Sequence, residues 1–158
     1  MKELFKFYIP SHLGYLDLIH KLTEKIVGEL TQDGRIQYHL TLAASEAVTN
    51  AIVHGNQENL SKDVVLRFFY DEDQIKIEVE DQGKGFDPSR VRSKAQDENL
   101  YRESSRGVFL IQTLMDRVKF LPQTGQGTKI EMIKYLNLKH SKNEKTLALT
   151  KNSSYNNH

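Results

Sequence analysis

The segment S45-E-A-V-T-N-A-I-V-H-G55 decides the fold, because it combines a helical apolar stripe with polar residues at the edge of that stripe. Glu46, Asn50 and His54 recur every four positions, so on a helix they lie close to one line. The alanine, valine and isoleucine residues around them follow the period of a buried helical face. The pattern predicts a helix over 35–54, ended by Gly55, which suits the left-handed conformation after a helix.

Glu46 and Asn50 form the first candidate site, a carboxylate base beside an amide oxygen. An amide oxygen suits Mg²⁺, which takes oxygen ligands and keeps waters and substrate phosphates in its shell. A solvated helix face is the alternative, and it explains most isolated pairs of this kind. His54 alone is interpreted as structural. A zinc site from His39, Glu46 and His54 is a further alternative, although its spacing matches no known zinc pattern.

The second motif, E80-D-Q-G-K-G-F-D87, follows a run over 74–81 in which apolar and polar residues alternate as in a half-buried strand. Asp81 at the end of this strand is placed to accept a hydrogen bond from an exocyclic amine. Gly83 and Gly85 permit a close approach of the backbone to a ligand. The alternative is a simple glycine turn. The motif is not the dinucleotide fingerprint, because the third glycine and the following helix are missing.

The third motif, S104-S-R-G107, is predicted to open a helix over 107–117. The free N–H groups of a helix N-terminus bind anions, and Arg102 and Arg106 add forked donors for phosphate. The alternative is a pair of N-capping serines beside a solvated arginine. The fourth motif, G125-Q-G-T128, is by itself a hairpin turn that enters the last strand.

The remaining chain supplies strands and helices in an order that predicts the fold class. Ser11 is a plausible N-cap for the first helix, Asp33-Gly34 is a turn, and 82–106 is a long loop. Strands paired in hairpins with helices between them predict an α+β two-layer sandwich, with a mainly antiparallel mixed sheet and helices on one face. Strands are expected at 3–9, 64–70, 74–81, 118–121 and 128–136, and helices at 12–30, 35–54 and 107–117.

Composition restricts the possible classes of protein. The 158 residues suit one domain over 1–136, followed by a polar tail over 137–158 that we expect to be disordered. There is no cysteine, so disulfides and thiolate metal sites are excluded. Lys and Arg number 22 against 21 Asp and Glu, a balance that argues against direct binding of nucleic acid or of an anionic membrane. No membrane span or signal peptide is visible, so we expect a cytoplasmic protein.

Together and in this order, the four motifs resemble the GHKL, or Bergerat-fold, ATP-binding family. The resemblance is closest to the anti-sigma factor serine-protein kinases of bacterial partner-switching systems, and it covers about residues 3–135. The matching stretches are S45-E-A-V-T-N-A-I-V-H-G55, E80-D-Q-G-K-G-F-D87, S105-R-G-V-F-L-I111, L114-M-D-R-V118 and G127-T128.

The resemblance implies a role for each motif in binding Mg-ATP. Asn50 is expected to ligate Mg²⁺, Glu46 to act as general base toward a serine hydroxyl, and Asp81 to bind the adenine amino group, with Thr128 assisting through water. The loop with Gly83 and Gly85 folds over the nucleotide, and residues 87–106 form a lid. Further nucleotide contacts are expected from Phe86, Arg102, Ser105, Arg106, Gly107 and Val108. The family usually has a glycine at the position of Ser105, so a backbone with positive φ there would be strained.

The function that the resemblance implies is an ATP-dependent serine-protein kinase that is also an anti-sigma factor. Such a protein phosphorylates a STAS-domain antagonist and sequesters a sigma factor. A homodimer is expected as well, mainly because the resemblance implies one; the strand over 3–9 agrees with it, since it carries apolar residues on both faces. The alternative is a non-catalytic ATP-binding switch protein that grips its partner according to the bound nucleotide. The catalytic half of a histidine kinase is disfavoured, because no helix with a phospho-acceptor histidine precedes the domain.

Overall fold

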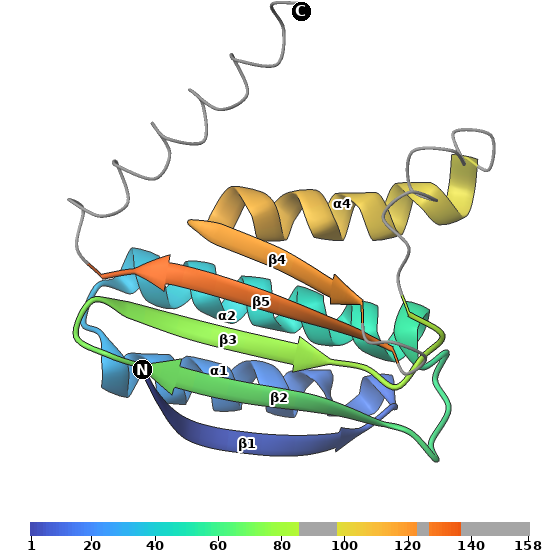
Figure 1. The fold of residues 1–158 in the computed structure, drawn as a ribbon, viewed down its shortest axis with the longest axis horizontal. Helices are drawn as coiled ribbons and strands as arrows, with labels where there is room; N and C mark the ends of the chain where they lie inside the picture. The colour runs from blue at the N-terminus through green and yellow to red at the C-terminus, as the bar shows by residue number, and fades with distance from the viewer. Residues whose placement is uncertain (86–97, 123–126, 137–158) are drawn as a thin grey trace, which may run out of the picture.

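The computed structural model describes residues 1–85, 98–122 and 127–136 (Figure 1). The predicted order of strands and helices is confirmed. The tail over 137–158, and with it the predicted boundary of the domain, lies outside the described residues. The elements are β1 (Lys2–Pro10), α1 (Leu16–Leu30), α2 (Gly34–Asn50), β2 (Asp63–Tyr70), β3 (Gln74–Glu80), α4 (Glu98–Leu114), β4 (Arg117–Pro122) and β5 (Thr128–Tyr135).

The strands form one five-stranded sheet with the order β1-β2-β3-β5-β4. All four pairings are antiparallel, and three of them, β1 with β2, β2 with β3 and β4 with β5, join strands that are consecutive in the chain. The α+β class is therefore confirmed. The expectation of a mixed sheet is not confirmed, because the described residues contain no parallel pair of strands.

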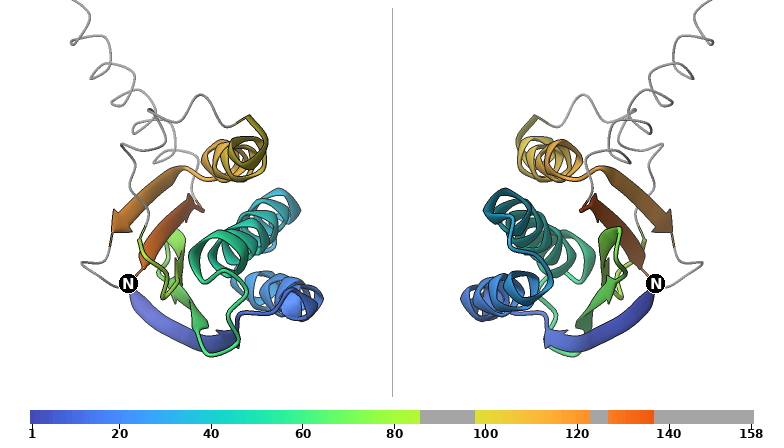
Figure 2. Two further views of the ribbon diagram at one scale, coloured as in Figure 1. Left: turned by 90° about the vertical axis from the view of Figure 1, so that its right-hand side faces the viewer. Right: turned by 90° about the vertical axis from the view of Figure 1, so that its left-hand side faces the viewer.

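Helices α1, α2 and α4 cover one face of the sheet and leave the other face open (Figure 2). The strand alternation explains the core, because Phe68, Ile75 and Ile77 point toward the helices and are fully buried. Helix α2 is central: it packs against both α1 and α4, and its residues Leu40 and Val48 are fully buried. This central position brings the polar edge of α2 close to both α4 and the end of β3.

Two corrections concern the segments that begin the helices. Ser11 does not cap α1: it is fully buried, and its hydroxyl donates to the carbonyl oxygen of Lys62 at 2.7 Å. A short 3₁₀ turn, Leu13–Tyr15, leads into α1, and the His12 Nδ1 accepts its Gly14 N–H at 3.0 Å. Asp33, predicted in a turn, is the N-cap of α2.

The end of α2 also differs from the prediction. The α-helix ends at Asn50 and continues as one π-helical turn, Ala51–Gly55, closed by the Asn56 N–H donating to the Ala51 oxygen at 2.8 Å. Gly55 does not take the left-handed conformation. That conformation occurs at Gln57 and Glu58, with φ of 55° and 54°. The glycine at 55 therefore serves a purpose other than ending a helix.

Helix α4 begins well before the predicted position. It runs over Glu98–Leu114 rather than 107–117, so residues 98–106, assigned to a loop and lid from sequence, are helical. The rest of the predicted lid, with Phe86, lies in the range 86–97 outside the described residues. Within the described part of the chain, no helix has both the length and the apolar character of a membrane span.

Candidate functional site

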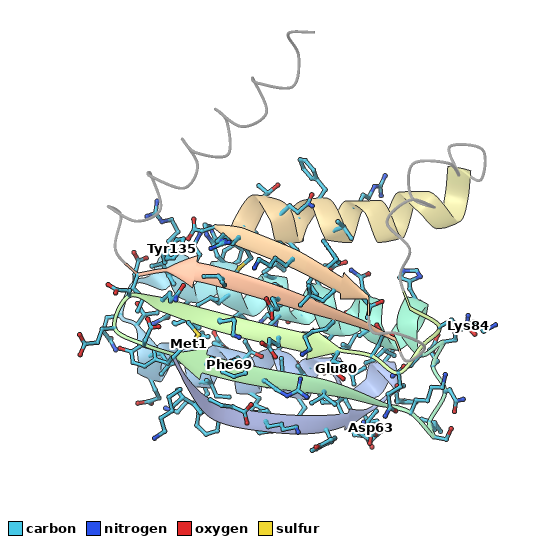
Figure 3. The ribbon with its side chains drawn as sticks, in the orientation of Figure 1. Met1, Asp63, Phe69, Glu80, Lys84 and Tyr135 are labelled. Carbon is cyan, nitrogen blue, oxygen red and sulfur yellow. The ribbon has the colours of Figure 1, made fainter. Side chains whose placement is uncertain are left out.

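A cavity of about 470 Å³ lies between α2, α4 and the ends of strands β3, β4 and β5. Its volume falls in the range of ordinary small-molecule sites. Figure 3 marks this end of the sheet by Lys84, with Asp63 nearby and Met1 and Tyr135 at the opposite end. The lining residues are Ala47, Asn50, Ala51, His54, Gly55, Gln57, Lys62, Val79, Asp81, Lys84, Gly85, Val108, Ile111, Phe120, Thr128 and Ile130.

Asp81 supplies a buried carboxylate to this cavity, and only 7% of the residue is exposed. Its Oδ1 accepts the N–H of Gly83 at 2.8 Å, and its own N–H donates to the carbonyl oxygen of Thr128 at 3.0 Å. Burial raises the pKa of the Asp81 carboxyl, while backbone hydrogen bonds from Gly83 and Thr128 and the charge of Lys62 oppose this shift. The carboxylate is thus fixed in position and dry on most sides.

Three glycines enclose Asp81, and the space they leave is what allows the aspartate to fit. A Cβ on Gly55 would lie 2.7 Å from the Asp81 Cβ, and a Cβ on Gly83 or Gly127 would lie 2.9 Å from its Oδ1. Real Cβ atoms essentially never come so close to another heavy atom. We call Asp81 with Gly55, Gly83 and Gly127 the Asp81 end of the cavity.

Glu46, Asn50 and Gly107 form the second part of the site, which we call the Asn50 end. Helix α4 passes so close to α2 that a Cβ on Gly107 would overlap the Glu46 Oε1 and lie 2.9 Å from the Asn50 Nδ2. Among the described residues, the side chains of Glu46 and Asn50 form no hydrogen bond or ion pair. Their oxygens are thus available to a ligand or a hard cation such as Mg²⁺.

The polar groups follow one another along α2 and its π-helical extension. Gly55 contacts Asp81, Asn50 lies five residues earlier, and Glu46 four residues before that. At about 1.5 Å of rise per residue, these spacings amount to roughly 7 Å and 6 Å along the helix axis. A ligand lying along α2 therefore meets a buried carboxylate first, then an amide, then a second carboxylate.

The predicted site residues fall into three groups. Asn50, Asp81, Gly85, Val108 and Thr128 line the cavity. Glu46, Gly83 and Gly107 do not line the cavity but lie close to it. Gly83 packs against Asp81, and Gly107 packs against Glu46 and Asn50. Arg106 is exposed on α4, the backbone of Arg102 and Ser105 is part of the same helix, and Phe86 lies outside the described residues.

The predicted anion site at a helix N-terminus is wrong. Ser104–Gly107 lies in the interior of α4, where backbone N–H groups are taken up by helical hydrogen bonds. The same fact removes the expected strain at Ser105, because a right-handed helix requires no positive φ there. Gly107 is needed for the close approach to Glu46 and Asn50 instead.

Several lining residues were not among the predicted site residues. His54, Gln57, Lys62 and Lys84 add polar groups, and Ile111 and Phe120 add apolar walls. His54, read as structural, is exposed and faces the cavity. The zinc alternative finds no support, since no group of three or more metal-binding side chains occurs among the described residues.

A family model described as the histidine kinase-like ATPase domain matches residues 9–134, which is most of the chain. The chain belongs to this ATPase family. The resemblance to GHKL proteins that the motifs carry is thereby confirmed. The family match begins at the end of β1, of which it includes only Ile9 and Pro10, and it runs through β5 except for the last residue of that strand.

Two kinds of relative extend this result. The chain is 33% identical over 152 residues to the serine-protein kinase RsbW of Staphylococcus aureus strains JH9 and Newman, covering 90% of this chain and 92% of the relative. A solved structure of a blue-light activated histidine kinase from Erythrobacter litoralis has 22% sequence identity and a TM-score of 0.50. It covers 81% of this chain, but this chain spans only 42% of that kinase, so the likeness concerns the fold alone.

Proposed function

We propose that the chain is an ATP-dependent serine-protein kinase whose nucleotide lies along α2. The observation that carries this proposal is the succession of Asp81, Asn50 and Glu46 beside one cavity in a chain of the histidine kinase-like ATPase family. The likeness to a serine-protein kinase over nine-tenths of the chain supports serine as the acceptor.

In this proposal the Asp81 end holds the adenine. A buried carboxylate accepts a hydrogen bond from the 6-amino group, and the apolar residues Val79, Ile111 and Ile130 pack against the base. Thr128, whose carbonyl oxygen holds the Asp81 N–H, supports this contact. A carboxylate fits this role because its two oxygens offer about four lone pairs, so Asp81 can accept from the 6-amino group as well as from the backbone of Gly83 and Thr128.

The Asn50 end holds the phosphates. The Asn50 amide oxygen and phosphate oxygens together supply the hard ligands that Mg²⁺ prefers, with waters completing the shell. Mg²⁺ neutralises charge on the phosphates when it is bound. Lys62 and Lys84 add positive charge to the cavity wall. Phe86, Arg102, Ser105 and Arg106 remain predictions of nucleotide contact.

Glu46 acts as the base in transfer. It accepts the proton of the serine hydroxyl, the serine oxygen bonds to the γ-phosphorus, and the bond from that phosphorus to the bridging oxygen of ADP breaks. The products are phosphoserine and ADP. Gly107 lets α4 pack close enough to restrict the position of the Glu46 carboxylate.

The partners in this proposal are a STAS-domain antagonist, which carries the serine, and a sigma factor, which the protein sequesters in the cytoplasm. A second copy of the chain is a further partner. Its support is β1, an edge strand whose Phe5 and Tyr8 are 45% and 62% exposed. Light scattering at tens of micromolar protein is expected to give the mass of a dimer, and a monomer mass would contradict this part.

The test of the kinase is transfer of labelled γ-phosphate from Mg-ATP to a serine of a STAS-domain antagonist. Glu46→Gln is expected to lower the rate at least about 100-fold while ATP affinity changes little. Glu72→Gln, in the exposed hairpin between β2 and β3, is the matched control and is expected to transfer normally. Tight ATP binding and antagonist binding without transfer would instead establish the non-catalytic switch.

A further inference from the structure

Asn56 is the most completely bonded buried polar side chain near the cavity, although it does not line it. Only 1% of the residue is exposed. Its Nδ2 donates to the Ser11 hydroxyl oxygen at 2.8 Å and to the Asp63 carbonyl oxygen at 3.0 Å, and its Oδ1 accepts the Gln82 N–H at 2.7 Å. Both amide protons are therefore used, and so is the carbonyl oxygen.

These bonds join four segments that are distant in the sequence. Ser11 follows β1, Asn56 follows the π-helical turn, Asp63 begins β2 and Gln82 follows β3. Two further bonds close the network: the Ser11 hydroxyl donates to the Lys62 carbonyl oxygen at 2.7 Å, and the Asp63 N–H donates to the Gln82 Oε1 at 2.8 Å. The bond between Asn56 and Ser11 at the centre of the network is buried, and hydrogen bonds shielded from water hold one geometry firmly.

The bond to Gln82 matters because this residue directly follows Asp81. The N–H of Gln82 belongs to the peptide unit that carries the Asp81 carbonyl, so the Asn56 oxygen fixes the plane of that unit. On the other side, the Asp81 N–H is held by the Thr128 oxygen at 3.0 Å. The backbone of Asp81 is thus anchored on both sides, and Asn56 supplies one of the two anchors.

We propose that Asn56 is a positioning residue for adenine recognition: its bond to the Gln82 N–H sets the direction of the Asp81 carboxylate toward the 6-amino group. This inference rests on the proposed function, in which Asp81 reads that amino group. Without the bond, the N–H beside Asp81 loses its protein partner, and the peptide unit that carries the Asp81 carbonyl is no longer held in one plane.

Substitutions at Asn56 and Ser11 remove different hydrogen bonds of the network. An aspartate at position 56 keeps an oxygen for the Gln82 N–H but loses both donors to Ser11 and Asp63. An alanine loses all three bonds. Ser11→Ala removes a partner on the far side of the network and leaves the Gln82 bond in place. These variants separate the stability of the network from the position of Asp81.

The experiment measures by calorimetry the affinity of the protein for two nucleotides in the presence of Mg²⁺. One is ATP, and the other is purine riboside triphosphate, which lacks the 6-amino group. The wild-type protein is expected to prefer ATP by about tenfold, the size of one hydrogen bond to a charged group. Asn56→Ala is expected to lower this preference at least about threefold. Asn56→Asp and Ser11→Ala are expected to keep it within about twofold, even where they lower the unfolding temperature.

The outcomes distinguish the two levels of the proposal. If Asp81→Asn keeps the wild-type preference, Asp81 does not read the amino group and its proposed role fails. If Asp81→Asn removes the preference but Asn56→Ala keeps it, the positioning role of Asn56 is overturned while the adenine site stands. If Asn56→Ala is not obtained folded, Asn56→Ser replaces it, because a serine side chain is too short to reach the Gln82 N–H. If Asn56→Ser keeps the wild-type preference for ATP, the inference is also overturned.

Discussion

The Asp81 end and the Asn50 end of the cavity are built differently. At the Asp81 end, the carboxylate and the flanking backbone are hydrogen bonded, and Gly55, Gly83 and Gly127 pack closely around the residue. At the Asn50 end, α4 also approaches through a glycine, but what it meets are the tips of two side chains. Within the described ranges, the side chains of Glu46 and Asn50 form no hydrogen bond or ion pair.

In the proposed function, this difference assigns recognition of the nucleotide to the Asp81 end and phosphoryl transfer to the Asn50 end. In that function, a carboxylate that is already held loses little freedom when adenine binds, so its contact contributes more fully to affinity. Side-chain oxygens without protein partners are available to coordinate a cation and to accept a hydrogen bond from the hydroxyl group of an acceptor. The comparison predicts that a Cβ added at a glycine of the Asp81 end costs stability, whereas a Cβ added at the glycine of the Asn50 end costs activity.

The largest expected effect is on stability, from Gly127→Ala. Gly127 has a φ of +89°, and a Cβ there would overlap the backbone oxygen of Asp81. The left-handed conformation and the forced movement of backbone together are expected to lower the free energy of unfolding by about 3 kcal/mol. Urea denaturation of the nucleotide-free protein measures this change.

Gly28→Ala is the matched control for that measurement. Gly28 lies within α1, and a Cβ there would meet nothing within 4 Å. Alanine in place of glycine in a helix is expected to raise the free energy of unfolding by about 0.5–1 kcal/mol. Equal effects of the two substitutions would contradict the close packing described at Asp81.

Gly107→Ala is expected to affect activity rather than stability. The Cβ meets the end of the Glu46 side chain, which can move, and alanine favours the helix, so the free energy of unfolding should change by no more than about 1 kcal/mol. The displaced carboxylate is expected to slow phosphoryl transfer about 100-fold. Phosphoryl-transfer assays measure the loss of activity, and urea denaturation measures the change in the free energy of unfolding. If Gly107→Ala lowers the free energy of unfolding as much as Gly127→Ala does, the distinction between the two ends is contradicted.

The smallest of these effects concerns pH. Burial raises the pKa of Asp81, so the ionised carboxylate lowers the stability of the nucleotide-free protein at every pH above the folded pKa. Asp81→Asn removes this cost, and the variant is expected to be more stable than wild type at pH 7. The gain should shrink as pH falls through the raised pKa and vanish below about 3.9, the usual pKa of aspartate. Urea denaturation over this range is the measurement; a variant less stable than wild type at pH 7 would refute it.

Much of the fold was predictable because its signals are local. The alternation of Ile75, Ile77 and Val79 gave β3 with its buried face, and the stripe around Val48 gave α2. Asp81 and Asn50 were predictable as site residues for the same reason, since a polar residue at a strand end or at the edge of a stripe is visible in the sequence.

What the sequence could not supply depends on distant contacts. Residues 98–106 have few apolar residues in a helical period, so the first half of α4 was read as loop. Gly55 next to Asn56 resembles a helix stop, yet Gly55 makes room for Asp81, and Asn56 bonds to Ser11 and Gln82. No local pattern contains partners 45 and 26 residues away.

Calorimetric titration of Mg-ATP and of metal-free ATP into wild type, Asn50→Ala and Asp81→Asn tests the central claim most directly. Asp81→Asn is expected to weaken both titrations by about tenfold, because the adenine contact does not depend on the metal. Asn50→Ala is expected to weaken Mg-ATP binding more than metal-free binding, because it removes a ligand of the ion. Unchanged Mg-ATP affinity in both variants would contradict an ATP site between Asp81 and Asn50.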